Sequence, residues 1–331
     1  MEKSKIRLGF VFMLSVLMAW SGTAFAQVTQ QQVRGQFLKG TQGKTVAWCP
    51  IWLGVLETEW TNIMKEDFER YGVHFVVRDS QFKPDVQVQT VETLINQHPD
   101  VLIVQSGNQT NTARVIKKAM DEGIYVVEVN MPSVQVSDAY VGIDAPQVGR
   151  EVAEDMVKEL GGGKTSGEIA ILQGDPAAPY SRDQVTAALP VFKKDPHIKI
   201  VANLPTMWDS NKGSEIISTV IQAHPKLAGV WSVWGPQTAG AGQALRNAHS
   251  NAKIWVTTDG QIADYNELKQ GYYYKMLSYR ANLQAQTIVD AVLNLLQLHP
   301  KPGSTHVAYY TPLFWLNSPA QSQYSWNPKK F

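Results

Sequence analysis

The sequence predicts an α/β protein made of two Rossmann-like lobes, each built on a parallel sheet. From Lys44 onward, short β-branched runs alternate with longer amphipathic stretches, a pattern typical of parallel sheets with right-handed helical crossovers. The strands that this pattern gives are too many for one small open sheet, and a segment pattern occurs twice along the chain. These observations predict two lobes facing each other across a cleft, with ligand-binding groups at the carboxyl ends of the strands.

The predicted strands are short runs of apolar and β-branched residues bounded by turn residues or charges. In chain order, they are expected at 44–48, 73–78, 100–105, 124–129, 139–143, 167–172, 197–203, 227–233, 252–257 and 272–278. The stretches between them repeat apolar residues at helical spacing. Helices are therefore expected near 59–71, 85–97, 109–122, 145–160, 180–194, 210–223, 237–248, 261–270 and 281–298.

The internal repeat places two helix ends at equivalent points. Leu94–Val104 and Val220–Val230 share the same order of a helix end, a His-Pro pair and a strand. Proline after the histidine blocks continuation of the helix. Each unit is followed by a polar loop, a helix and a second strand, which leads to Asn130 in the first unit and to Asp259 in the second. The duplication predicts one such unit in each lobe.

The first 26 residues have the three-part layout of a secretory signal peptide. Basic residues occupy positions 3, 5 and 7, an apolar run covers 8–20, and Ala24-Phe25-Ala26 forms a cleavage signal. The apolar run is shorter than the ~20 residues that a membrane-spanning helix needs. We therefore expect export, with cleavage after Ala26. Residues 27–43 are rich in Gln, Gly and Thr without apolar periodicity, and are expected to form a flexible lead-in.

Composition and missing motifs exclude several functional classes. Lys and Arg number 30 against 29 Asp and Glu, a net charge of +1, so we expect no nucleic-acid partner. Cys49 is the single cysteine, which excludes a disulfide framework and a cysteine-rich metal site. The histidines are scattered, and neither His-Glu-x-x-His nor Gly-x-Ser-x-Gly occurs. We therefore expect no metal, no cofactor and no catalytic residues.

Polar and aromatic residues recur where the predicted strands end, in both halves of the chain. The candidate ligand-binding residues are Trp60, Asp79, Gln105, Asn130, Arg182, Trp208, Trp234, Asp259 and Tyr279. The same loops also hold Trp52, Glu57, Glu59 and Tyr180. Flat aromatic rings pack on C–H faces, while carboxylates, amides and arginine bind hydroxyls. The set therefore indicates a site for a small neutral polyhydroxy ligand.

Segments spread over roughly residues 44–300 resemble a known family. The matching segments are Tyr71–Gln81, Ile116–Val127, Val141–Asp144, Ala170–Gly174, Ser181–Asp183, Met207–Asp209, Gln222–Pro225 and Thr258–Gly260. Together they resemble the periplasmic sugar-binding proteins of ABC importers, in the ribose/galactose-binding branch that shares its fold with LacI-type repressors. A repressor is not expected, because a signal peptide stands where a DNA-binding headpiece would precede residue 44.

The resemblance implies a type I periplasmic binding protein whose lobes are joined by three hinge strands. One lobe would combine 44–143 with 280–300, and the other 144–279 with 301–331. The family's ligand contacts would fall on Trp60, Gln105, Arg182, Trp208, Asp259 and Tyr279. Arg182 would donate to sugar oxygens, Asp259 would accept from sugar hydroxyls, and Trp208 would close over the ring.

Two departures from the family pattern bear on the ligand. The family often has Asp-Arg where this chain has Asn130-Met131, and Asn-Asp where it has Trp234-Gly235. A charged pair and an amide are lost, and an indole is gained. A more aromatic pocket favours a hexose, a modified sugar or a polyol with apolar faces. A cationic ligand in an aromatic box, with Asp259 as its counter-charge, stays open.

The resemblance therefore implies an exported solute-binding protein, not an enzyme. It would capture a small neutral sugar or polyol in the cleft and deliver it to an ABC permease in the inner membrane. Two alternatives stay open. One is an exported α/β enzyme acting on sugars, and the other is a sensory protein that presents a sugar-like ligand or a small amine to a membrane receptor.

Overall fold

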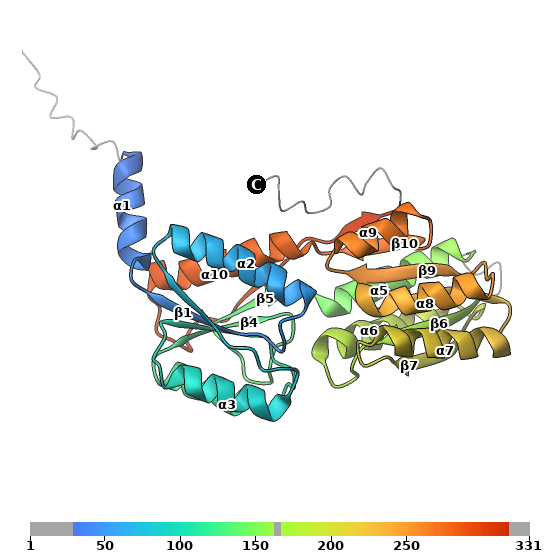
Figure 1. Cartoon of the computed structure of the whole chain (residues 1–331), viewed down its shortest axis with the longest axis horizontal. Coiled ribbons are helices and arrows are strands. Elements are labelled where there is room, and N and C mark those ends of the chain that lie inside the picture. The colour runs from blue at the N-terminus through green and yellow to red at the C-terminus, as the bar shows by residue number, and fades with distance from the viewer. Residues whose placement is uncertain (1–28, 162–166, 318–331) are drawn as a thin grey trace, which may run out of the picture.

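The computed structural model describes residues 29–161 and 167–317. The predicted signal peptide and its cleavage site lie outside these residues. The described chain forms two α/β lobes that lie side by side (Figure 1). In the described part of the chain, no helix combines the length and the apolar character needed to cross a bilayer.

The first lobe is built on a fully parallel sheet of six strands. Its spatial order is β11-β5-β4-β3-β1-β2. The strands are β1 (Thr45–Cys49), β2 (His74–Val77), β3 (Val101–Val104), β4 (Tyr125–Val129), β5 (Ala139–Gly142) and β11 (Val307–Tyr310). The central strand β3 is buried at every position, as expected for a parallel sheet covered on both faces.

The second lobe repeats this architecture with the order β12-β10-β9-β8-β6-β7. Its strands are β6 (Gly167–Gln173), β7 (Ile198–Pro205), β8 (Leu227–Ser232), β9 (Lys253–Thr258), β10 (Lys275–Ser278) and β12 (Phe314–Leu316). All pairs are parallel except β10 with β12, which is antiparallel. The predicted two-lobe α/β architecture is therefore confirmed, and each predicted strand corresponds to one of β1 to β10.

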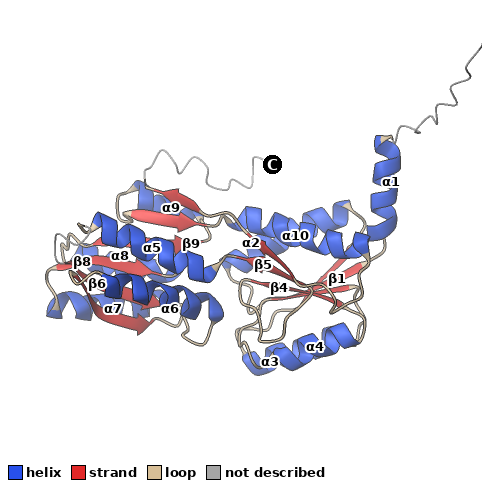
Figure 2. Cartoon of the chain, turned by 180° about the vertical axis from the view of Figure 1, so that it is seen from behind, coloured by secondary structure: helices blue, strands red, loops and turns tan. Residues whose placement is uncertain are grey.

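Helices cover both faces of each sheet. In the first lobe, α2 (Val55–Arg70) and α10 (Ala281–Leu298) cover one face, and α3 (Pro84–Ile95) and α4 (Ala113–Asp121) cover the other (Figure 2). In the second lobe, α5 (Ala145–Glu159) and α6 (Pro179–Lys194) pack on one face. The opposite face packs against α7 (Ser210–Ala223), α8 (Gly235–Asn247) and α9 (Ile262–Lys269).

The chain passes between the lobes three times. The crossings follow β5, follow β10, and lie between β11 and β12. The second crossing returns the chain from β10 to α10, which packs along α2 in the first lobe. Each lobe is therefore assembled from separate stretches of sequence, and the crossings form the predicted three-strand hinge.

The C-terminal segment departs from the sequence-based prediction, which assigned 301–331 to the second lobe. Val307–Tyr310 instead extends the first sheet by pairing with β5, and Tyr310 packs edge-on against Tyr140 with ring centroids 6.0 Å apart. Phe314–Leu316 alone joins the second sheet. Residues 318–331 lie outside the described part of the chain. The reason for the difference is the open edge of β5, whose backbone groups need a pairing strand.

The expected flexible lead-in is also wrong for most of its length, because residues 30–41 form helix α1 (Gln30–Thr41). A capping box starts it: the Thr29 hydroxyl accepts from the Gln32 amide at 3.2 Å, and the Gln32 side chain accepts from the Thr29 amide at 2.8 Å. Phe37 packs edge-on against Tyr71 at 4.9 Å between ring centroids. The end of α1 is thereby fixed to the first lobe, from which the helix projects (Figure 1).

Candidate functional site

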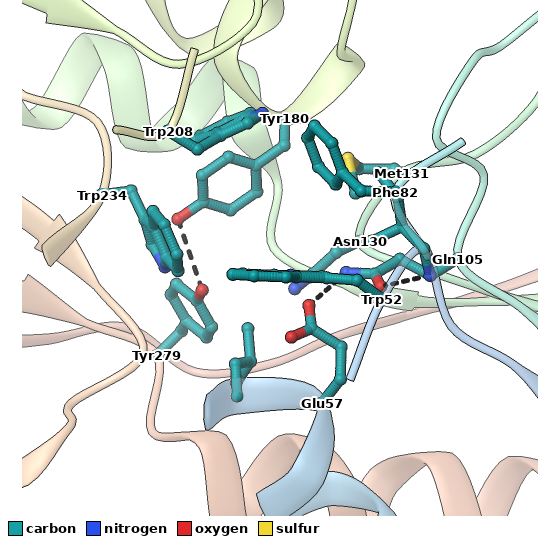
Figure 3. Close-up of a pocket in the computed structure, with 12 residues that line it drawn as sticks. Trp52, Glu57, Phe82, Gln105, Asn130, Met131, Tyr180, Trp208, Trp234 and Tyr279 are labelled. Atoms are coloured by element: carbon teal, nitrogen blue, oxygen red, sulfur yellow. Dashed lines mark hydrogen bonds between the residues drawn. The ribbon is translucent and has the colours of Figure 1, made fainter. Parts of the chain in front are cut away.

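A cavity lies between the lobes and holds about 480 Å³ of empty space, part of which is open to solvent. Its wall consists of Ile51, Trp52, Leu56, Glu57, Phe82, Gln105, Asn130, Met131, Tyr180, Trp208, Trp234 and Tyr279. Figure 3 shows these side chains converging from both lobes on one space. The cavity therefore has the position of a ligand site between two lobes.

The wall is built where the parallel strands end. Trp52 follows β1, Gln105 follows β3 and Asn130 follows β4 in the first lobe. In the second lobe, Trp208 follows β7 and Trp234 follows β8. The carboxyl ends of open parallel sheets are where ligands bind in α/β folds. This edge of each sheet faces the cavity because the lobes face each other across the hinge.

Five of the sequence-predicted site residues line the cavity. They are Gln105, Asn130, Trp208, Trp234 and Tyr279. The other four, Trp60, Asp79, Arg182 and Asp259, are not part of its wall. Each of the four has a structural environment that explains its placement.

Asp259 lies behind the wall. Its side chain is fully buried and accepts hydrogen bonds from the Gln261 side-chain amide at 2.8 Å and from the Thr258 hydroxyl at 3.2 Å. Burial raises the pKa of Asp259, and hydrogen bonds that include one from Trp234 oppose that rise. Asp259 is thereby placed to hold the Trp234 indole in the wall and not to contact the cavity itself.

Trp60 belongs to the core of the first lobe and not to the cavity. It is fully buried and packs edge-on against Trp48, with ring centroids 6.4 Å apart. Together with Met64 and Phe68 it forms the buried stripe of α2 at a helical spacing of four residues. In the loop between β1 and α2, the aromatic side chain that reaches the cavity is that of Trp52. The signal available in the sequence was the apolar stripe of α2, which includes Trp60 and not Trp52.

Asp79 and Arg182 serve local contacts outside the cavity. The Asp79 carboxylate accepts from the Gln81 amide at 2.8 Å and fixes the loop after β2. Arg182 donates to the Asp183 carboxylate at 2.8 Å and, across the cleft, to the Gln109 side-chain oxygen at 3.0 Å. Arg182 therefore joins the second lobe to the first beside the cavity.

Glu57 is a wall residue that the sequence-based selection of site residues left out. One carboxylate oxygen, Oε1, accepts from Gln105 Nε2 at 3.0 Å, and Gln105 Oε1 accepts from the Ile51 amide at 3.2 Å. The second oxygen, Oε2, is buried without a hydrogen bond from any described residue. Burial raises the pKa of Glu57 to about 7; hydrogen bonds from Gln105 and from the backbone of Glu57 and Gly54 oppose the rise, and the charge of Asp259 adds to it.

Aromatic side chains form most of the remaining wall. Trp208 and Trp234 meet nearly at right angles, with ring centroids 5.7 Å apart. The ring centroid of Tyr180 lies 6.1 Å from that of Trp208, and its hydroxyl lies 3.3 Å from that of Tyr279 (Figure 3). On the first-lobe side, Trp52 packs against Phe82 with centroids 5.9 Å apart. Such a wall suits ligand faces made of C–H groups.

The loop that carries Trp208 has an unusual backbone. Met207 and Trp208 both have left-handed φ values, of 54° and 66°, which non-glycine residues rarely adopt outside constrained sites. The Thr206 hydroxyl accepts from the Trp208 amide at 3.2 Å and stabilises this turn. The indole lies so close to Gly174 that a Cβ added there would stand 2.1 Å from the ring. Glycine at 174 is therefore needed for this position of Trp208.

Comparison with known structures shows the fold. A solute-binding protein of an ABC transporter from Burkholderia graminis, solved with D-arabinose, matches with a TM-score of 0.79 and 23% identity, over 86% of this chain and 99% of that chain. A periplasmic solute-binding protein from Actinobacillus succinogenes, solved with D-allose, matches with a TM-score of 0.74 and 21% identity, over 85% of this chain and 99% of that one. At these identities, the likeness concerns the fold alone.

Curated relatives are similar at the sequence level. The D-allose-binding periplasmic protein of Escherichia coli is 27% identical over 183 residues, which is 53% of this chain and 58% of that protein. The D-ribose/D-allose-binding protein of Pseudomonas aeruginosa is 26% identical over 218 residues, covering 63% of this chain and 67% of that protein. The chain thus aligns with little more than half of the first relative's length.

The family model described as "Periplasmic binding protein domain" matches residues 55–300. This range contains the described helices from α2 to α10, ten of the twelve cavity-wall residues and the first two hinge crossings. Since the match covers most of the sequence, the chain belongs to the periplasmic binding protein domain family.

Proposed function

We propose that the chain is an exported solute-binding protein that captures a small neutral sugar or polyol between its lobes and delivers it to an ABC permease of the inner membrane. The observation that carries this proposal is the aromatic-walled cavity at the strand ends of both lobes, beside a three-crossing hinge. The relatives named for binding allose and ribose support a sugar as the ligand. Family membership supports a binding role over an enzymatic one.

The proposed ligand contacts are the wall residues of both lobes. Gln105 and Asn130 would bind hydroxyls from the first lobe, while Trp208, Trp234 and Tyr279 would pack on the ligand from the second lobe and the hinge. Asp259 would act through Trp234, and Arg182 through the contact with Gln109. Ligand that touches both lobes stabilises the closed arrangement, because it gains its second set of contacts only there.

Family membership implies a periplasmic location. Export by a signal peptide over residues 1–26, with cleavage after Ala26, is part of the proposal. Docking of the closed, ligand-bound form on the permease would then complete delivery.

A thermal-shift screen of the mature protein against sugars, polyols and small amines tests the proposal. A ligand present at 100 times its dissociation constant stabilises the folded state by about 2.7 kcal/mol, which raises the melting temperature measurably. We expect a sugar or polyol to raise it, and small-angle scattering to show a more compact protein with that ligand. A screen in which amines alone raise it contradicts the proposed ligand, and saturating solutes that leave compactness unchanged contradict the proposed closure.

A further inference from the structure

Hydrogen-bonding capacity is distributed unevenly around the cavity. The polar side chains of the wall are Glu57, Gln105 and Asn130, and all of them come from the first lobe. The second lobe and the hinge contribute Tyr180, Trp208, Trp234 and Tyr279, all aromatic. A ligand in this cavity therefore meets carboxylate and amide groups on the first-lobe side only, beside Trp52 and Phe82, and mainly ring faces on the other side (Figure 3).

The two wall amides already bond to the protein. Asn130 and Gln284 form a reciprocal pair, with Asn130 Nδ2 donating at 3.1 Å and Asn130 Oδ1 accepting at 2.8 Å. Gln105 donates to Glu57 and accepts from the Ile51 amide. An amide group can make four hydrogen bonds at most, so each of these retains only part of its capacity for a ligand. Their orientations are fixed by the same bonds.

The Glu57 carboxylate is the strongest acceptor that the cavity offers. Glu57 is 4% exposed, and its Oε2 atom receives no hydrogen bond from any described residue. Figure 3 shows the carboxylate among the wall side chains, beneath Trp52. A buried carboxylate oxygen without a donor is costly. A ligand hydroxyl that donates to this atom removes that cost.

The phenol groups add little to this capacity. Tyr180 and Tyr279 bond to each other through their hydroxyls at 3.3 Å, so one of the two phenolic hydrogens is used within the protein. Burial raises the pKa of the Tyr279 phenol most, and Tyr180, the charge of Asp259 and the charge of Glu57 add to the rise. The carboxylate and amide groups of the wall therefore remain its main polar capacity, and they lie on the first-lobe side.

A sugar with hydroxyls all around its ring would turn some of them toward the aromatic faces. Each hydroxyl buried there without a partner loses its bonds to water and gains none in return. We propose that the ligand is a deoxy or O-methylated sugar, or a polyol of the same one-sided polarity, with a hydroxyl that donates to Glu57 Oε2 and C–H faces that contact Trp208 and Trp234. This inference rests on the proposed function and specifies its substrate class.

Titration calorimetry on matched ligand pairs tests the inference with the mature protein. The pairs are D-fucose with D-galactose, 2-deoxy-D-ribose with D-ribose, and methyl α-D-glucoside with D-glucose. In each pair of which a member binds, we expect the less hydroxylated member to bind at least about tenfold more tightly, because the parent leaves a buried hydroxyl unpaired. Equal or tighter binding of the parent in those pairs overturns the inference.

Two variants in α2 test whether the ligand donates a hydrogen bond to Glu57. Glu57→Gln keeps the size of the side chain but removes the carboxylate, and at pH 8, above the Glu57 pKa of about 7, it should weaken binding of the best ligand at least about tenfold. Glu69→Gln is the matched control: this residue lies on the same helix with a side chain that is 62% exposed, and it should leave affinity unchanged. Circular dichroism and melting curves establish that both variants are folded. Wild-type affinity in Glu57→Gln overturns the proposed hydrogen bond from the ligand to Glu57.

The same experiments separate this inference from the proposed function. If D-allose or another fully hydroxylated sugar binds while no member of the matched pairs does, the one-sided ligand class is overturned and the sugar-binding function stands. If no sugar or polyol of either kind binds to the folded protein, the proposed function fails, and the inference fails with it.

Discussion

At the scale of single residues, the position of the Trp208 ring depends on a neighbour that has no side chain. The indole lies over Gly174 and meets Trp234 nearly at right angles. The left-handed backbone at Met207 and Trp208 leads the ring into this place. A wall of this kind is sensitive to small displacements, because the dispersion attraction between packed rings and a ligand weakens steeply with distance.

Gly174→Ala should therefore impair binding with little effect on stability. The added Cβ would stand 2.1 Å from the Trp208 ring, so the half-buried indole has to move. We expect calorimetry to show at least about a tenfold loss of affinity, with a melting temperature close to that of the wild type. Gly35→Ala is the control, because an added Cβ there meets nothing within 4 Å. Full affinity in Gly174→Ala would show that the Trp208 position does not matter.

Buried carboxyl groups should make the ligand-free protein less stable as the pH rises. Burial raises the pKa of Glu57 and of Glu128 from 4.5 to about 7. The folded state therefore holds protons that the unfolded state releases above its lower pKa, and stability is lost between about pH 4.5 and 7. For one such group the loss is about 3 kcal/mol.

Urea unfolding of the ligand-free protein at pH 5 and pH 8 measures this dependence. We expect a higher free energy of unfolding at pH 5. Glu57→Gln should reduce the difference between the two pH values, since the amide does not titrate, whereas Glu69→Gln should preserve it. A stability that rises from pH 5 to pH 8 in the wild type would contradict the prediction.

The site could be predicted from the sequence only in part, and Trp60 and Trp52 show why. Both follow β1, and loop position alone does not distinguish them. Trp60 falls on the apolar stripe of α2 with Met64 and Phe68, so the helical period directs it into the core. Gln105 and Asn130 directly follow strands, where position along the chain determines the side that they face. Whether Arg182 reaches a ligand or the opposite lobe depends on lobe geometry, which no local pattern contains.

At the scale of elements, α1 is the helix that the apolar pattern does not indicate. Its residues are mostly polar, so hydrophobic periodicity gives no signal there. The capping box at Thr29 and Gln32 was readable in the sequence. Strand β11 was missed for a different reason, because its exposed residues gain stability from pairing with β5 and not from a buried face.

Thr29→Ala should loosen α1 without destabilising the lobes. Loss of an N-cap costs about 0.5–2 kcal/mol of helix stability, and α1 buries little of its surface. We expect faster hydrogen exchange in the first turn of α1 and an unchanged midpoint of global unfolding. Gln31→Ala, an exposed neighbour outside the capping box, is the control. A lower global midpoint in Thr29→Ala would mean that α1 unfolds together with the first lobe.

At the scale of the whole molecule, the two lobes and their hinge were predictable because the duplicated His-Pro segments mark equivalent helix ends. The hinge itself follows from chain connectivity once two sheets are assumed. The Arg182–Gln109 bond is the feature that sequence could not supply, since the residues come from different lobes and meet across the cleft.

Arg182→Ala should weaken closure and not ligand contact. The Arg182 side chain is 41% exposed, so its 3.0 Å bond to Gln109 is worth little, and we expect a roughly 2–10-fold loss of affinity. Gln109→Ala should have the same effect, and the double variant should be no worse than either single one. Calorimetry measures the cycle. Additive losses would show that the two side chains act independently.

The strand order of the first sheet has a consequence for how the protein is made. A ribosome that has synthesised only the first 143 residues has produced β1 to β5, but neither α10 nor β11. One face of that nascent sheet is covered by α2 without α10, and its β5 edge stays unpaired until β11 is translated. The first lobe to be synthesised is thus among the last structures to be completed, and folding before that point leaves the apolar surface that α10 covers exposed.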